Sequence, residues 1–150
     1  MQDTENRTCQ FTRDIGKTVR SLSDIDAFVL LFKGETNRLT PNIRGQINIF
    51  QQLFGREFWR KVIIGITFWP HDGISRRRRA KGTTKTEKEK TENWQTTLRS
   101  EMGVQMDVPL VFIDGVIDEE LSDEMQMQIF GNETKKLLQF MEEEIGRAHV

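Results

Sequence analysis

The sequence predicts an α/β fold of three layers, in which a parallel β-sheet carries helices on its faces. Three apolar segments rich in β-branched and aromatic residues alternate with three longer segments whose apolar residues recur at helical spacing. This alternation is typical of parallel sheets, because the crossover between two parallel strands usually contains a helix. The length of 150 residues suits one domain.

The first expected element is a helix over residues 8–23. Its apolar residues recur every three or four positions, which predicts a single stripe buried against the rest of the fold. The stripe consists of Phe11, Ile15, Val19 and Leu22. A mostly apolar run over 25–33 then predicts a strand covered on both faces, which Gly34 ends.

Three further elements form the middle of the chain. Thr40 and Pro41 supply an N-cap and a proline at the first helical position, so we expect a helix from there to Gly55. A second buried strand is expected over 61–68, and a helix over 83–102. The strand-helix unit is thereby repeated.

The third unit is a strand over 108–114 and a helix over 132–144. We therefore expect the domain to occupy residues 1–144. The remaining residues, 145–150, reverse-translate in one reading frame to the start of a sequencing adapter, so we expect a non-native tail; a frayed C-terminus is the alternative.

Composition excludes several classes of function. With 22 Lys and Arg against 23 Asp and Glu, the net charge of −1 gives no reason to expect a nucleic-acid partner. The only cysteine, Cys9, cannot form an internal disulfide and favours a reducing, cytoplasmic compartment. No apolar run approaches the ~20 residues that span a bilayer, and two isolated histidines do not predict a metal site.

Charge is nevertheless uneven along the chain. Eight basic and two acidic residues lie between Arg76 and Lys90, a local balance of +6. Ten acidic and two basic residues lie between Asp114 and Glu144, a balance of −8. Both segments are interpreted as solvated surfaces, with partner binding as the alternative.

Ligands of open α/β sheets bind at the carboxyl ends of the strands, so the loops that follow the strands are the candidate site. Asp72 can accept hydrogen bonds from the edge of a planar base, while Trp69 and His71 offer faces for stacking. The combination suits a purine. The alternative is that Trp69 and Pro70 turn the chain and Asp72 caps the next segment.

Several segments resemble, in order and spacing, the second half of a G domain. They are residues 26–32, 38–40, 54–59, 64–69 and 108–114. The chain is most similar to the avirulence-induced-gene type of G domain, that of the septin-related P-loop GTPases known as GTPases of immunity-associated proteins. The resemblance spans about residues 3–141.

The resemblance implies a site for a guanine base between the loops that follow the second and third strands. The residues expected to line the base are Thr67, Trp69, His71, Asp72, Ile113, Asp114 and Gly115. In the complete parent domain, GTP or GDP would be the cofactor, together with Mg²⁺.

The sequence contains neither the Gly-rich phosphate loop, nor an Asp-x-x-Gly, nor a threonine placed as the switch residue. Gln2–Glu5 resembles the stretch that follows the Asp-x-x-Gly, so we expect a partial G domain that lacks its N-terminal strands. We therefore predict no catalytic residue, no bound metal and at best weak nucleotide binding in this chain, whereas the resemblance implies a parent that hydrolyses or switches on GTP.

Two further expectations follow from a partial G domain. The strand that includes 27–32 would have lost a neighbour, which leaves an apolar edge prone to self-association. The alternative function is a nucleotide-independent interaction module that keeps only the G-domain shell, using the basic segment or the acidic C-terminal helix to hold a protein partner.

Overall fold

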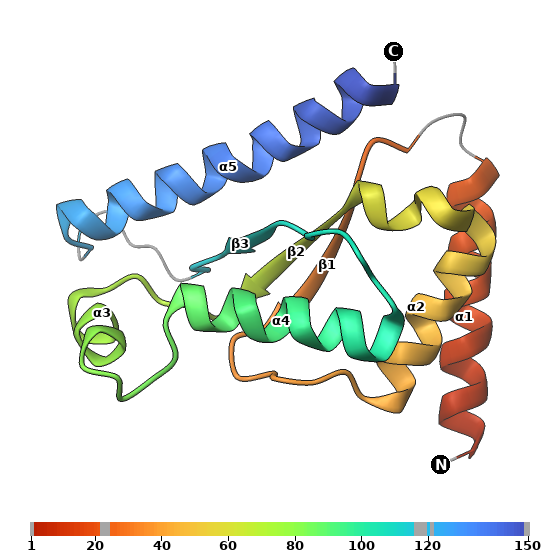
Figure 1. Cartoon of the computed structure of the whole chain (residues 1–150), viewed down its shortest axis with the longest axis horizontal. Coiled ribbons are helices and arrows are strands. Elements are labelled where there is room, and N and C mark those ends of the chain that lie inside the picture. The colour runs from red at the N-terminus through yellow and green to blue at the C-terminus, as the bar shows by residue number, and fades with distance from the viewer. Residues whose placement is uncertain (1, 22–24, 116–119, 121, 149–150) are drawn as a thin grey trace.

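A computed structural model describes residues 2–21, 25–115, 120 and 122–148. Its centre is a parallel sheet of three strands in the order β1 (Phe28–Lys33), β2 (Val62–Thr67) and β3 (Leu110–Phe112) (Figure 1). Each strand lies within its predicted range, and the parallel sheet is confirmed. The described helices are α1 (Gln2–Ser21), α2 (Pro41–Phe54), α3 (Gly73–Ala80), α4 (Glu87–Met102) and α5 (Glu124–Ala148), with the 3₁₀ helix η1 (Gly55–Lys61).

The main core lies on one face of the sheet, beneath α2, η1 and α4. Alternate residues of each strand enter this core, among them Phe32, Ile64 and Phe112. Trp94 of α4 stacks on the Phe32 ring at a centroid distance of 4.4 Å, and Phe58 of η1 packs 5.0 Å from the Phe28 ring. Aromatic packing therefore holds α4 and η1 on the sheet.

The other face of the sheet is open over β1. Val29, Leu31 and Ile113 surround Gly65 on this face, and the Leu31 side chain is 61% exposed. The expectation that this strand is covered on both faces is wrong. The reason is that α5 packs against β3, at the far edge of the sheet, and leaves the outer face of β1 uncovered (Figure 1).

The predicted buried stripe of α1 is wrong as well. Phe11 is 65% and Ile15 is 39% exposed, and the buried positions are Thr12 and Gly16. The helix packs on α2, where a Cβ at Gly16 would overlap Leu53 Cδ1. The small side chain permits close helix packing, and the larger apolar side chains face outward. Val19 is half-buried, and Leu22 lies outside the described residues.

Several helices differ from expectation, and α1 begins at Gln2, before the expected start at residue 8. The basic segment after Asp72 forms α3, which the pattern did not predict, and α4 begins at Glu87, after its N-cap Thr86. α5 begins at Glu124, well before residue 132, and its backbone stays helical to Ala148, inside the expected tail. Residues 149 and 150 lie outside the described part. No helix in the described part combines the length and the apolar composition needed to cross a membrane.

Candidate binding pocket at the carboxyl edge of the sheet

The strands of the sheet run toward α3, and a cavity of about 750 Å³ opens at the carboxyl ends of β2 and β3 (Figure 1). We call it the carboxyl-edge pocket. It brings together six of the seven residues expected to line a base, and adds Phe68, Pro70 and Gln126. The expected residues that line it are Thr67, Trp69, Asp72, Ile113, Asp114 and Gly115.

Phe68 is the most exposed aromatic side chain of this pocket, and it is not among the residues expected to line the base. The residue has a φ of 52°, the left-handed region that a bulky side chain rarely adopts, and it is 71% exposed. Its neighbours fix the backbone, because Gly34 N donates to Thr67 O at 2.7 Å and Trp69 N donates to Ile113 O at 3.2 Å. Lys33 Nζ lies 5.9 Å from the ring centroid.

The ring of Trp69 packs against other side chains of the protein. One neighbour is the Phe112 ring at a centroid distance of 4.9 Å, and another is the Arg79 guanidinium carbon at 5.1 Å from the Trp69 centroid. The indole Nε1 donates to Glu87 Oε1 at 3.1 Å, and the residue is 7% exposed. Trp69 therefore builds the wall of the pocket, and Phe68 offers the more exposed aromatic ring.

Asp72 is the N-cap of α3, which agrees with the alternative prediction that this residue caps the next segment. Its carboxylate accepts hydrogen bonds from Ser75 Oγ at 2.6 Å and from Ser75 N at 3.2 Å. The bond from the Ser75 hydroxyl is the largest influence that lowers the pKa of Asp72 below its usual value. A carboxylate has about four acceptor positions, so Asp72 can also accept from a ligand in the pocket.

Asp114 connects the loops behind the pocket. The buried Oδ2 accepts from His71 N at 2.9 Å and from Gln126 Nε2 at 3.1 Å, which joins the loop after β2 to α5. This brace keeps the carboxyl ends of β2 and β3 together.

His71 is the one expected base contact that does not line the pocket. It is 1% exposed, and its Nε2 lies 3.2 Å from Phe112 O. A carbonyl oxygen can only accept, so Nε2 donates this hydrogen bond, and the buried Nδ1 has no hydrogen-bond partner among the described residues. His71 therefore supports the wall from behind.

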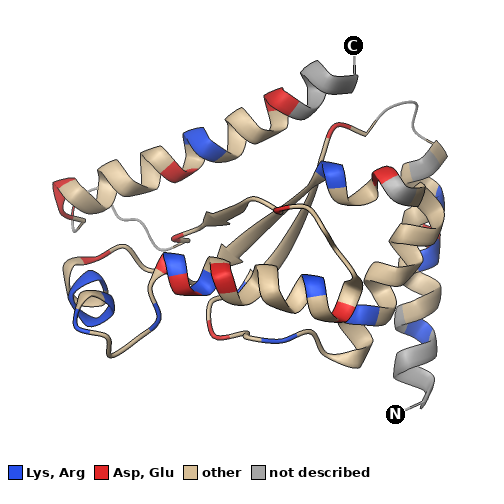
Figure 2. Ribbon diagram, in the orientation of Figure 1, with Lys and Arg blue, Asp and Glu red and all other residues tan. Residues whose placement is uncertain are grey.

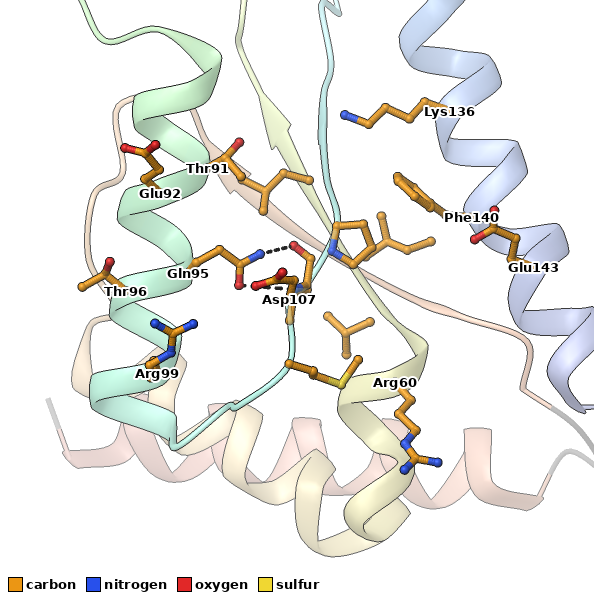
Figure 3. A pocket seen from close by; sticks show the side chains of 16 residues that line it. Arg60, Thr91, Glu92, Gln95, Thr96, Arg99, Asp107, Lys136, Phe140 and Glu143 are labelled. Carbon is orange, nitrogen blue, oxygen red and sulfur yellow. Dashed lines mark hydrogen bonds between the residues drawn. The ribbon is translucent and has the colours of Figure 1, made fainter.

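A second cavity of about 750 Å³, which we call the α4–α5 groove, runs along β3 (Figure 3). In it, Gln95 of α4 donates from Nε2 to Val108 O at 2.6 Å and accepts from Val108 N at 3.2 Å. The charged residues of its rim are Arg60, Arg99, Lys136, Glu92, Asp107 and Glu143. None of the residues expected to line a base lies in this groove.

Comparison of the chain with protein-family models, with curated proteins and with solved structures found no match. Within the described residues, no three His, Cys, Asp or Glu side chains gather closely enough to hold a metal ion. The residues of the carboxyl-edge pocket are therefore the basis for a functional hypothesis.

Proposed function

We propose that the carboxyl-edge pocket binds a planar heterocycle, and that its ligand is the guanine base of a nucleotide. The observation that carries this proposal is the exposed Phe68 ring in one pocket with the carboxylates of Asp72 and Asp114. An aromatic face stacks on a base, and carboxylates accept from N–H groups, of which guanine presents several along one edge. The volume suits a small-molecule site.

The binding we propose is weak. Stacking of a base on one aromatic ring contributes ~1–3 kcal/mol, which by itself corresponds to a dissociation constant of about a millimolar or weaker. The lining residues of this pocket include no Lys or Arg, so its own walls offer phosphates no positive charge. We propose a partial GTPase-like domain that holds the base and does not hydrolyse GTP, because phosphoryl transfer depends on positively charged groups around the phosphates.

Titration of guanosine into the protein, followed by amide NMR shifts, tests the proposal. Phe68→Ala should raise the dissociation constant at least fivefold, since it removes the stacking face. Phe11→Ala is the matched control, because Phe11 is 65% exposed and lies on α1. Asp72→Ser retains an N-cap but loses the carboxylate, and should weaken binding without unfolding α3. Shifts that do not saturate, or that survive in Phe68→Ala, would contradict the proposal.

A nucleotide-independent interaction module is the second candidate function. It is favoured by the exposure of large apolar side chains on α1 and β1, namely Phe11, Ile15 and Leu31. Sedimentation velocity over a hundredfold range of concentration tests self-association. The double variant Phe11→Ser and Ile15→Ser, or Leu31→Ser, should reduce the mass of any complex, and a monomer at every concentration would contradict association between copies.

A further inference from the structure

A third cavity, of about 390 Å³, lies beside the carboxyl-edge pocket and shares three wall residues with it, Phe68, Trp69 and Pro70. We call it the basic pocket. The loop after β1, α3 and the residues at the start of α4 enclose it. Its lining contains one acidic residue, Glu35, and four basic residues, which are Arg78, Arg79, Lys85 and Lys90.

Lys90 is the residue that sets this pocket apart from an ordinary charged surface. It is 1% exposed, and its Nζ donates to Thr36 O at 2.5 Å and to Asn37 Oδ1 at 2.7 Å. Both partners are neutral, and they use two of the three N–H groups of the ammonium. Among the described side chains, no Asp or Glu forms an ion pair with this amine.

A buried ammonium without a counter-ion is energetically costly, because its charge is removed from water and not compensated. Burial, followed by the nearby charge of Lys85, lowers the pKa of Lys90. An anion in the pocket would compensate both charges. The neighbouring Arg79 already has a partner, since its Nε lies 3.4 Å from Glu87 Oε1.

The outer rim of the pocket carries two further positive charges, on Arg78 and Lys85. Neither side chain forms an ion pair with a carboxylate among the described residues. Arg78 and Lys85 are exposed and line the opening from α3 and from the loop before α4. Figure 2 shows α3 as a largely blue helix next to the start of α4. An exposed cation on each side and the buried Lys90 form a concave cationic site.

We propose that the basic pocket binds a phosphate group, with Lys90 at its base and with Arg78 and Lys85 at its rim. This part is independent of the proposed function. Because the two cavities share the wall from Phe68 to Pro70, a phosphorylated heterocycle can place its ring in one and its phosphate in the other. This second part rests on the proposed function.

Titration of inorganic pyrophosphate at fixed ionic strength, followed by NMR shifts and by tryptophan fluorescence, tests the first part. Saturable binding at millimolar concentration is expected. Lys85→Gln and Arg78→Gln should each raise the dissociation constant at least threefold, while the controls Lys88→Gln and Arg77→Gln, neighbours that do not line the pocket, should change it less than twofold.

Lys90→Met removes the buried charge and should abolish pyrophosphate binding, but it also removes two hydrogen bonds, so its fold is checked by circular dichroism. The two rim variants keep the test decisive if Lys90→Met does not fold. Equal weakening in rim and control variants would indicate unspecific attraction to positive charge and overturn the proposal, as would a lack of saturation.

Three ligands separate the two proposals. Guanosine alone reports on the carboxyl-edge pocket, pyrophosphate alone on the basic pocket, and GDP on both. If pyrophosphate saturates and guanosine does not, the proposed function fails while the phosphate site stands. If both bind, GDP should bind at least tenfold more tightly than either, and a GDP affinity equal to that of the better fragment would overturn joint occupancy.

Discussion

The carboxyl-edge pocket and the α4–α5 groove have the same volume, about 750 Å³, but their walls differ in kind. The groove has a rim of both charge signs and a wall in which Gln95 pairs with both backbone polar groups of Val108. The carboxyl-edge pocket has an exposed aromatic side chain, Phe68, in a strained backbone conformation. Volume alone therefore does not distinguish a packing gap from a binding site.

The wall of the groove and the wall of the carboxyl-edge pocket also contribute differently to the stability of the fold. β3 is an edge strand of three residues, and the Gln95 amide pairs with Val108 beside it much as another strand would. These hydrogen bonds satisfy the backbone of Val108, which precedes the strand, without a ligand. A left-handed phenylalanine costs ~1–2 kcal/mol and gains little from burial when it is 71% exposed. The strained turn places Trp69 in the core and leaves the Phe68 ring exposed at the carboxyl edge, where it can contact a ligand.

The largest expected effect concerns the brace of the carboxyl-edge pocket. Asp114→Ala leaves the buried His71 N–H and the Gln126 amide without their acceptor, and should lower the free energy of unfolding by about 3 kcal/mol. Urea denaturation measures this loss. Asp114→Asn keeps one acceptor oxygen and should lose less than half as much. A loss under 1 kcal/mol for Asp114→Ala would show that this wall is not held by the brace.

The matching change in the groove should be smaller. Gln95→Ala removes two hydrogen bonds to Val108, but water entering the open groove can replace them, so we expect a loss of about 1–2 kcal/mol. Thr96→Ala on the same helix, which is exposed, is the control and should change stability by less than about 0.5 kcal/mol. Equal losses for Gln95→Ala and Asp114→Ala would remove the distinction between the two walls.

The comparison also shows which parts of the molecule local sequence could predict. Thr40 and Pro41 begin α2 as expected, and Gly103 ends α4 in a left-handed C-cap, because capping depends on neighbouring residues only. α3 was not predicted, because a run of arginines has no apolar period. Its helix depends on the Asp72 cap and on a tertiary contact, the packing of Arg79 against Trp69.

The position of the carboxyl-edge pocket could be predicted from the sequence, but the orientation of its aromatic side chains could not. Thr67 ends β2 and Asp114 follows the neighbouring strand β3, so the topology places them at one edge of the sheet. Which aromatic ring is free could not be predicted, because the left-handed backbone at Phe68 decides it: Trp69 is packed inside and Phe68 is exposed. Likewise, α1 buries Gly16 and not Phe11, since close packing on α2 favours the smaller residue.

A smaller effect on stability depends on pH. It is expected for Asp72 of the carboxyl-edge pocket, which is charged, and not for Gln95 of the α4–α5 groove, which is neutral. Asp72→Ala should lower stability at pH 7 by about 1 kcal/mol through loss of the α3 cap. Because the folded-state pKa of Asp72 lies below its usual value, the carboxylate contributes above pH 3.8, and its contribution is lost as the pH falls through the folded-state pKa. The difference between wild type and variant should therefore shrink in acid.

Urea denaturation at pH 7 and at about pH 2.5 measures this convergence. Gln95→Ala is the control, because the amide does not titrate and its cost should be the same at both pH values. A difference for Asp72→Ala that grows in acid would contradict the role of the Ser75 hydrogen bonds.

The smallest expected effect is a gain in stability. Phe68→Asn places at φ 52° a residue that tolerates the left-handed region, and it loses little burial because Phe68 is 71% exposed. We expect about 0.5 kcal/mol of added stability in urea denaturation, together with loss of guanosine binding. Leu138→Asn, an exposed apolar residue of α5 in ordinary helical conformation, is the control and should give no gain. If Phe68→Asn is destabilised instead, the ring is packed for structure, and the carboxyl-edge pocket resembles the groove after all.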